Sequence, residues 1–197
     1  MLRRVAGGCL GFLLSAAPLA AEWHFTPMVG MTFKGDTTLL IDFDSGASRR
    51  HNHFGGAVSL LGDGILGVEA IGVWTPGFFQ AENPVLVEKS RVTALMANVV
   101  VTAPKRWTEY SLRPFVSGGL GAIRVMQTDS RRVQPYDETF KSFNIGGGAV
   151  GFFSQRTGVR FDLRYYRTMR GIPDEVFAIG EPSLRYMTAS IGVVLRR

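Results

Sequence analysis

The sequence predicts an all-β fold, an eight-stranded antiparallel up-and-down transmembrane β-barrel. Three observations support this prediction. Apolar and polar residues alternate with period 2 through eight segments, as in strands with two different faces. The connections between these segments alternate between long and short, as in membrane barrels with long outer loops and tight turns on the other side. The long ones are expected over 34–52, 76–90, 127–141 and 168–183, and the shorter ones over 62–64, 103–110 and 154–157. Beyond the N-terminal segment no apolar run reaches 18 residues, so no membrane-spanning helix is expected.

The N-terminal segment, MLRRVAGGCLGFLLSAAPLAA (1–21), has the layout of a cleavable secretory signal peptide. We expect cleavage after Ala21, which leaves a barrel domain over residues 22–197. Without Arg3 and Arg4 the 22 basic residues become 20 against 16 acidic ones, a net charge of +4, and the only cysteine, Cys9, is lost. The mature chain then has no disulfide or thiol chemistry. Its positive charge is modest and dispersed, so no nucleic acid partner is expected.

The first mature segment, WHFTPMVGMTF (23–33), shows the alternation clearly. Odd positions from Trp23 to Phe33 are mainly apolar, with aromatic residues near both ends, and even positions such as His24 and Thr26 are polar or small. A soluble sandwich gives similar alternation without a reason for aromatics at each end. Aromatic girdles at the two interfaces of a membrane barrel supply that reason.

Three further segments follow in chain order. HFGGAVSLL (53–61) and ILGVEAIGVW (65–74) form a hairpin across the turn at 62–64, with Glu69 on the inward face. RVTALMANVVVT (91–102) is apolar on both faces, so its inward side is left unassigned.

Four more segments complete the set of eight. SLRPFVSGGLGAIRVM (111–126) has Arg113 and Arg124 on opposite parities, which predicts a glycine bulge between them. SFNIGGGAVGFF (142–153), VRFDLRYYR (159–167) and RYMTASIGVVLRR (185–197) follow, and the second of these alternates most sharply. Strands of about 11 residues, tilted by ~45°, span about 25 Å, the height of the apolar band of such a barrel.

With its expected signal, the VRFDLRYYR and RPFVSGGLG segments and an amphipathic last strand, the chain resembles the small outer membrane β-barrel domain family, of the eight-stranded OmpA/OmpX-like porin type. The resemblance covers residues 22–197. It implies a monomer in the cell outer membrane, in contact with lipopolysaccharide and other outer membrane lipids, and barrel assembly machinery as a partner. Family members commonly end on an aromatic residue, whereas this chain ends Leu195-Arg196-Arg197.

One glycine pattern suggests a different activity. Gly146, Gly148 and Gly151 have the G-x-G-x-x-G spacing of a dinucleotide-binding fingerprint. That fingerprint requires a helix directly after the glycines, and here a strand pattern follows. We therefore interpret the glycines as barrel wall and expect no cofactor.

Charged and polar residues on the inward parity are the main candidate site. An eight-stranded barrel is just wide enough for side chains to fill it, and buried charges need partners. We therefore expect a structural polar network that plugs the lumen, with a proton or solute path as the alternative. Its expected members are Glu69, Asn144, Arg160, Asp162, Arg164 and Tyr166.

Histidines and serines give weaker candidates. His51 and His53 could share a strand face, but a zinc site needs three or four ligands, and only Asp42 or Asp44 lies near enough in the sequence to join them. His53 and Ser59 lie about 20 Å apart along one strand, too far for a base and its nucleophile. No metal or catalytic site is therefore predicted.

The predicted function is a non-enzymatic structural or surface-exposed barrel that binds an unknown extracellular ligand through its long loops. Arg131 and Arg132 are candidates for contacts with lipopolysaccharide phosphates. A narrow channel for small or apolar solutes is the first alternative, and a lipid A-modifying enzyme is the second. The fold hosts unrelated activities, so the choice depends on the site.

Overall fold

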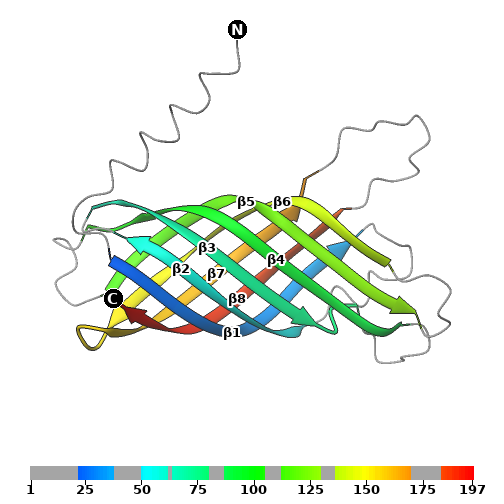
Figure 1. Ribbon diagram of the computed structural model, residues 1–197, viewed down its shortest axis with the longest axis horizontal. Helices are drawn as coiled ribbons and strands as arrows, with labels where there is room; N and C mark the ends of the chain where they lie inside the picture. The colour runs from blue at the N-terminus through cyan, green and yellow to red at the C-terminus, as the bar shows by residue number, and fades with distance from the viewer. Residues whose placement is uncertain are drawn as a thin grey trace, which may run out of the picture.

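Eight antiparallel strands form a closed barrel in the computed structural model, which describes residues 22–37, 50–61, 64–79, 87–104, 112–129, 136–169 and 183–197. Each strand pairs with the next in the chain, and β8 pairs with β1 to close the ring (Figure 1). The strands are β1 (Glu22–Thr37), β2 (His51–Leu61), β3 (Leu66–Pro76), β4 (Val87–Thr102), β5 (Leu112–Asp129), β6 (Tyr136–Phe152), β7 (Thr157–Thr168) and β8 (Leu184–Arg196). The predicted fold class is confirmed. The expected signal peptide lies outside the described residues.

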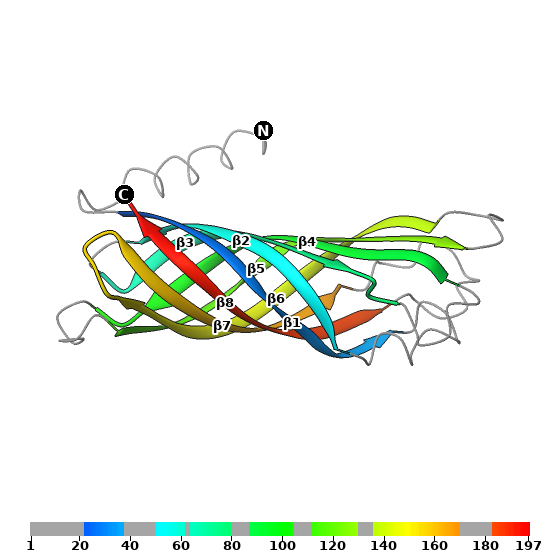
Figure 2. The same cartoon turned by 90° about the horizontal axis from the view of Figure 1, so that it is seen from below.

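The first and last strands begin and end at the same end of the barrel. The Trp23 amide donates to the carbonyl of Arg197 at 3.1 Å, and the Arg197 amide donates back to Trp23 at 2.9 Å. We call this the terminal end, and the opposite one the far end (Figure 2). None of the described residues forms a helix long and apolar enough to cross a membrane.

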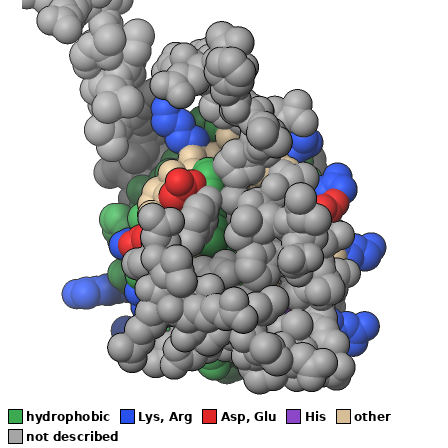
Figure 3. Space-filling view, turned by 90° about the vertical axis from the view of Figure 1, so that its right-hand side faces the viewer, with side chains coloured by type: hydrophobic (Ala, Val, Ile, Leu, Met, Phe, Trp, Pro, Cys, Tyr) green, Lys and Arg blue, Asp and Glu red, His purple; other side chains and the backbone are tan. Residues whose placement is uncertain are grey.

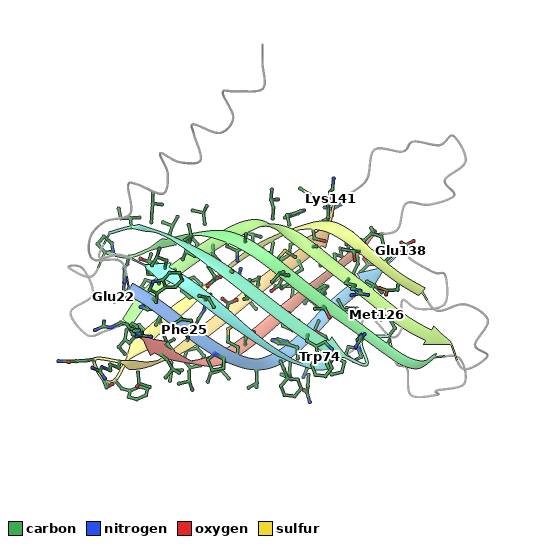
Figure 4. All side chains as sticks on the ribbon, in the orientation of Figure 1. Glu22, Phe25, Trp74, Met126, Glu138 and Lys141 are labelled. Atoms are coloured by element: carbon green, nitrogen blue, oxygen red, sulfur yellow. The ribbon has the colours of Figure 1, made fainter. Side chains whose placement is uncertain are left out.

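Side-chain alternation gives the wall an apolar outside and a mixed inside. Along β7 the side chains of Arg160, Asp162 and Arg164 are buried, whereas Phe161 and Leu163 between them are 56% and 48% exposed. Large exposed apolar side chains surround the wall on all eight strands (Figure 4). They include Phe25, Val29, Phe54, Val68, Trp74, Leu95, Val99, Val116, Leu120, Ile145, Ile191 and Val193. This distribution is the one expected of a wall that faces lipid.

The structure shows which face of β4 points into the lumen, which the sequence left open, and it contradicts the bulge predicted in β5. On β4, Val92, Ala94 and Met96 face the lumen and are buried. β5 pairs with β6 without a break from Leu112 to Gln127, so the predicted glycine bulge is wrong. Arg113 faces the lumen, whereas Arg124 is on the outer face, which explains their opposite parities.

Four strands reach at least three residues further toward the far end than predicted. β1 ends at Thr37, beyond the predicted end at Phe33. β5 runs to Asp129 and β6 begins at Tyr136, so most of the loop expected over 127–141 continues the β5–β6 hairpin (Figure 1). β4 likewise begins at Val87, inside the loop expected over 76–90. These extensions carry the strands beyond the apolar band.

Candidate functional site

Ion pairs cross the lumen between β3 and β7. The carboxylate of Glu69 accepts a hydrogen bond from Nη1 of Arg160 and another, at 3.1 Å, from Nη2 of Arg164. β3 and β7 are four strands apart in the closed ring of eight, so they form opposite walls. The pairs therefore bridge the full width of the barrel.

Asp162 lies between the two arginines on β7 and bonds to both. Its Oδ2 accepts from Nη2 of Arg160 at 2.6 Å and from Nη2 of Arg164 at 3.0 Å, and its Oδ1 accepts from Nε of Arg164 at 3.2 Å. The side chains of Glu69 and Arg164 have no exposed surface. Two carboxylates balance two guanidinium groups, and buried charges persist only with such compensation.

Two amides and one hydroxyl extend the hydrogen bonding, whereas Nε of Arg160 has no partner among the described residues. Asn144 accepts from Nη1 of Arg164 at 2.6 Å and donates to Oδ1 of Asn98 at 2.7 Å. Asn98 donates in turn to Glu69 at 3.2 Å, and Ser59 donates to the other oxygen of Glu69 at 3.1 Å. We call this set the lumen network: Ser59, Glu69, Asn98, Asn144, Arg160, Asp162 and Arg164.

Ser59 and Asn98 were not among the residues predicted for this network. The register of the β2–β3 hairpin places Ser59 directly opposite Glu69, and that pairing could have been derived from the short turn. Asn98 is a lone amide in the otherwise apolar stretch ALMANVVV. An amide in such a stretch is itself a signal, because an unpaired buried polar group is costly.

Tyr166 lies in the lumen but does not join the hydrogen bonds. Its hydroxyl has no hydrogen-bond partner in the described structure. Its ring instead stacks on Tyr186, with ring centroids 5.0 Å apart, and Tyr186 contacts Phe78 edge-on at 5.3 Å. Of the six expected residues, five are therefore joined by hydrogen bonds and ion pairs. Tyr166 belongs instead to an aromatic cluster between the network and the far end of the barrel.

This aromatic cluster is completed by a turn that folds inward after β3. Gly77 adopts a φ of 68°, which favours glycine, and its amide donates to the Ser90 carbonyl at 2.7 Å. The amide of Phe79 donates to Oγ of the same serine at 3.0 Å. Phe78 and Phe79 are consequently buried (0% and 3% exposed), although both lie in the long outer loop predicted over 76–90. Residues 80–86 of that loop lie outside the described residues.

A second apolar cluster fills the lumen on the terminal side of the network. It consists of Leu61, Val100, Phe115, Val150 and Val194. The guanidinium carbon of Arg160 lies 4.4 Å from the centre of the Phe115 ring, which is cation–π geometry. A cavity of about 10 Å³ remains beside Glu69 and Arg160, room for roughly one water molecule. The network is thus packed between two apolar clusters.

Two of the three glycines in the G-x-G-x-x-G stretch, Gly146 and Gly148, lie too close to β7 for a side chain. Gly146 pairs with Arg164 and Gly148 with Asp162 in the β6–β7 register. A Cβ atom on Gly146 would lie 3.0 Å from Cβ of Arg164, and one on Gly148 would collide with the carbonyl oxygen of Phe161. These positions in the barrel wall therefore need glycine for close packing, not for a nucleotide.

The lumen geometry can be compared with solved structures. No protein-family model and no curated protein sequence match the chain. The structure is similar to crystal structures of Neisserial surface protein A (TM-score 0.59, 11% identity, 88% of this chain and 96% of that one) and of OprG from Pseudomonas aeruginosa (0.56, 11%, 90% and 96%). It is also similar to Ail of Yersinia pestis (0.54, 14%, 91% and 100%). The chain has the fold of the small eight-stranded outer membrane barrels. The resemblance inferred from the sequence is thereby confirmed for the fold.

One histidine of this outer membrane barrel fold meets a serine inside the lumen. Nε2 of His53 lies 2.9 Å from Oγ of Ser190, and Nδ1 lies 3.3 Å from Oγ1 of Thr32. A base and a nucleophile also lie at such distances, but His53 is only 1% exposed and faces a filled lumen. We therefore interpret this pair as a structural contact, and the lipid A-modifying alternative receives no support from it.

Of the candidate metal ligands, the two histidines lie in the described part of the chain and the two aspartates do not. His51 stacks on Phe78 with ring centroids 5.6 Å apart. Within the described ranges no group of three or more His, Cys, Asp or Glu residues could hold a metal ion. Asp42 and Asp44, like Arg131 and Arg132, lie outside those ranges.

Proposed function

We propose that this protein is a non-enzymatic, monomeric barrel of the outer membrane that is closed to solutes and acts through its far-end surface. The observation that carries this proposal is the lumen network. Its ion pairs connect opposite walls, and side chains of both apolar clusters pack against it. A small-solute channel would need these buried, mutually compensated charges to separate.

The outer surface supports a location in a lipid bilayer. Aromatic pairs lie toward both ends of the apolar band: Trp23 with Phe25 toward the terminal end (6.4 Å), and Phe54 with Trp74 toward the far end (6.1 Å). Aromatic girdles of this kind mark the two interfaces of membrane barrels. The solved structures with the same fold are outer membrane proteins, such as OprG. We infer that the terminal end faces the periplasm and the far end the outside.

Single-channel recording in planar bilayers tests the closed lumen. The refolded chain should insert without discrete conductance steps, and a gel shift between heated and unheated samples should show that it is folded. Steps that appear in the wild type and change amplitude when Glu69 is replaced by Gln would overturn the proposal. They would establish the narrow channel instead.

A further inference from the structure

Basic side chains surround the outer face of the barrel near the far end. We infer that they form a binding site for the phosphate groups of a phosphorylated glycolipid of the lipid A class. We call this set the basic collar: Lys34, Arg50, Arg91, Arg124, Lys141, Arg167 and Arg185. All seven are exposed. They come from every strand except β3, with Arg50 directly before β2, and Lys and Arg side chains project around the rim in the end-on view (Figure 3).

The collar lies directly beyond the apolar band. Lys141 and Arg167 each lie two residues further toward the far end than the aromatic residue on the same outer face, Phe143 and Tyr165 respectively. Lys141 projects outward from the wall (Figure 4). Phosphates of a membrane lipid occupy this level, because they lie directly outside the layer that holds the acyl chains.

A β-bulge contributes one member of the collar. Even-numbered residues of β1 up to Thr32 face the lumen, so Lys34 would follow them inward in a regular strand. The pairing of β1 with β8 shifts between Phe33 and Asp36, and Lys34 has a φ of 51°, uncommon for a residue with a side chain. The bulge turns the lysine outward, where it is exposed.

The collar carries more positive charge than its own carboxylates neutralise. Arg124 pairs with Asp137 at 2.7 Å, and Arg185 pairs with Asp36. Arg91 donates to the sulfur of Met126 at 2.8 Å and shares the negative charge of Asp137 with Arg124. Lys34, Arg50, Lys141 and Arg167 have no acidic partner within the part of the chain that the structure describes.

Like charges are also held side by side. Arg167 and Arg185 are direct register partners on β7 and β8, and Lys141 is on the next strand, two residues beyond the partner of Arg167. Like charges directly opposite one another destabilise a sheet, so an anion between them would be stabilising. Phosphate suits the site because arginine binds it through two parallel hydrogen bonds. Acyl chains of the same lipid would cover the apolar band below.

The test measures the affinity of the refolded full chain, in neutral detergent, for fluorescent bisphosphorylated lipid A. The collar variant carries Arg50→Gln, Lys141→Gln and Arg167→Gln, three positions without a described ion pair. The matched control removes the same charge at the terminal end through Arg156→Gln, Arg196→Gln and Arg197→Gln. We expect the collar variant to bind at least roughly tenfold more weakly, while the control variant and the wild type bind alike. The heat-dependent gel shift checks that each variant is folded.

Three results would overturn the inference. The first is that the wild type binds lipid A without its two phosphates as tightly as bisphosphorylated lipid A. The second is that the collar variant and the control variant lose the same amount of affinity. The third is that the wild type binds phosphatidylglycerol, at matched charge, as tightly as bisphosphorylated lipid A. That result would indicate a surface for anionic lipids in general. The inference rests on the proposed location in the outer membrane but not on a closed lumen. If the barrel conducts ions but the collar variant still binds lipid A more weakly than the control, only the closed lumen is refuted.

Discussion

At the scale of single residues, Glu69 is the acceptor on which the lumen network depends. Its two oxygens together accept hydrogen bonds from Arg160, Arg164, Asn98 and Ser59, and these donors come from three other strands. Asp162 also binds both arginines but lies on their own strand. Glu69 is therefore the group that ties the β7 guanidinium groups to the opposite wall.

Replacing Glu69 by Gln should destabilise the barrel strongly. The substitution keeps the shape but leaves two buried guanidinium groups with one carboxylate, and breaking a buried pair in this way costs about 3–5 kcal/mol. The matched control is Asp137→Asn, which removes the partner of Arg124 in an exposed ion pair and should leave the unfolding midpoint nearly unchanged, because solvent screens such a pair. Urea unfolding in lipid vesicles measures both. Equal midpoints for the wild type and Glu69→Gln would show that the network contributes no stability.

At the scale of elements, the close approach of β6 and β7 depends on inward-facing glycines. Gly148 lies opposite Asp162, and an added Cβ would collide with the backbone of Phe161 rather than with a side chain that can move. At Gly56 on β2 the only atom of the described residues within 4 Å of an added Cβ, apart from its chain neighbours, is the Thr26 carbonyl oxygen, at 3.6 Å. The two glycines therefore differ in the space available, although both lie inside strands.

Gly148→Ala should destabilise the barrel, and Gly56→Ala should be nearly neutral. The first substitution forces β6 and β7 apart at the arginine pair, and overpacking of this kind typically costs about 1–3 kcal/mol. The second adds one methyl group in ordinary van der Waals contact. The temperature at which the folded band disappears in a heat-shift gel compares them. A Gly148→Ala variant as heat-resistant as Gly56→Ala would contradict the packing argument.

The elements that could be predicted from the sequence are those whose two faces differ in polarity. β7 alternates sharply because charged residues face the lumen and apolar ones face outward, so Arg160, Asp162 and Arg164 could be assigned to the inside. Glu69 on β3 and Asn144 on β6 were assigned in the same way, as polar residues opposite an apolar face. β4 could not be assigned, because Val92, Ala94 and Met96 on its inner face contribute to an apolar cluster and are as hydrophobic as its outer face. The outer part of the β5–β6 hairpin was taken for a loop, since beyond the apolar band its outer face becomes polar, with Asp137, Thr139 and Lys141, and no longer shows the outward apolar pattern of a membrane strand.

At the scale of the whole molecule, the barrel separates three environments within a few residues of one strand. On β5 the side chain of Leu120 is 59% exposed in the apolar band, Ile123 is fully buried in the lumen, and the side chain of Arg124 is 55% exposed in the basic collar. The proposed arrangement assigns these positions to lipid, to a dry interior and to water at the membrane surface, respectively. A channel would differ from it at Ile123 alone, because a water-filled lumen would reach that side chain.

Single cysteines at these three positions should therefore react differently with a membrane-impermeant maleimide. We expect Arg124→Cys to be labelled in vesicles and Leu120→Cys and Ile123→Cys to be protected, each in a chain that also carries Cys9→Ser. Unfolding in urea should make all three reactive, which shows that the thiols are intact. Labelling of Ile123→Cys in the folded protein would mean that water enters the lumen, and the closed barrel would be wrong. Labelling of Leu120→Cys would instead place the apolar band outside the lipid and remove the basis for a collar at the phosphate level.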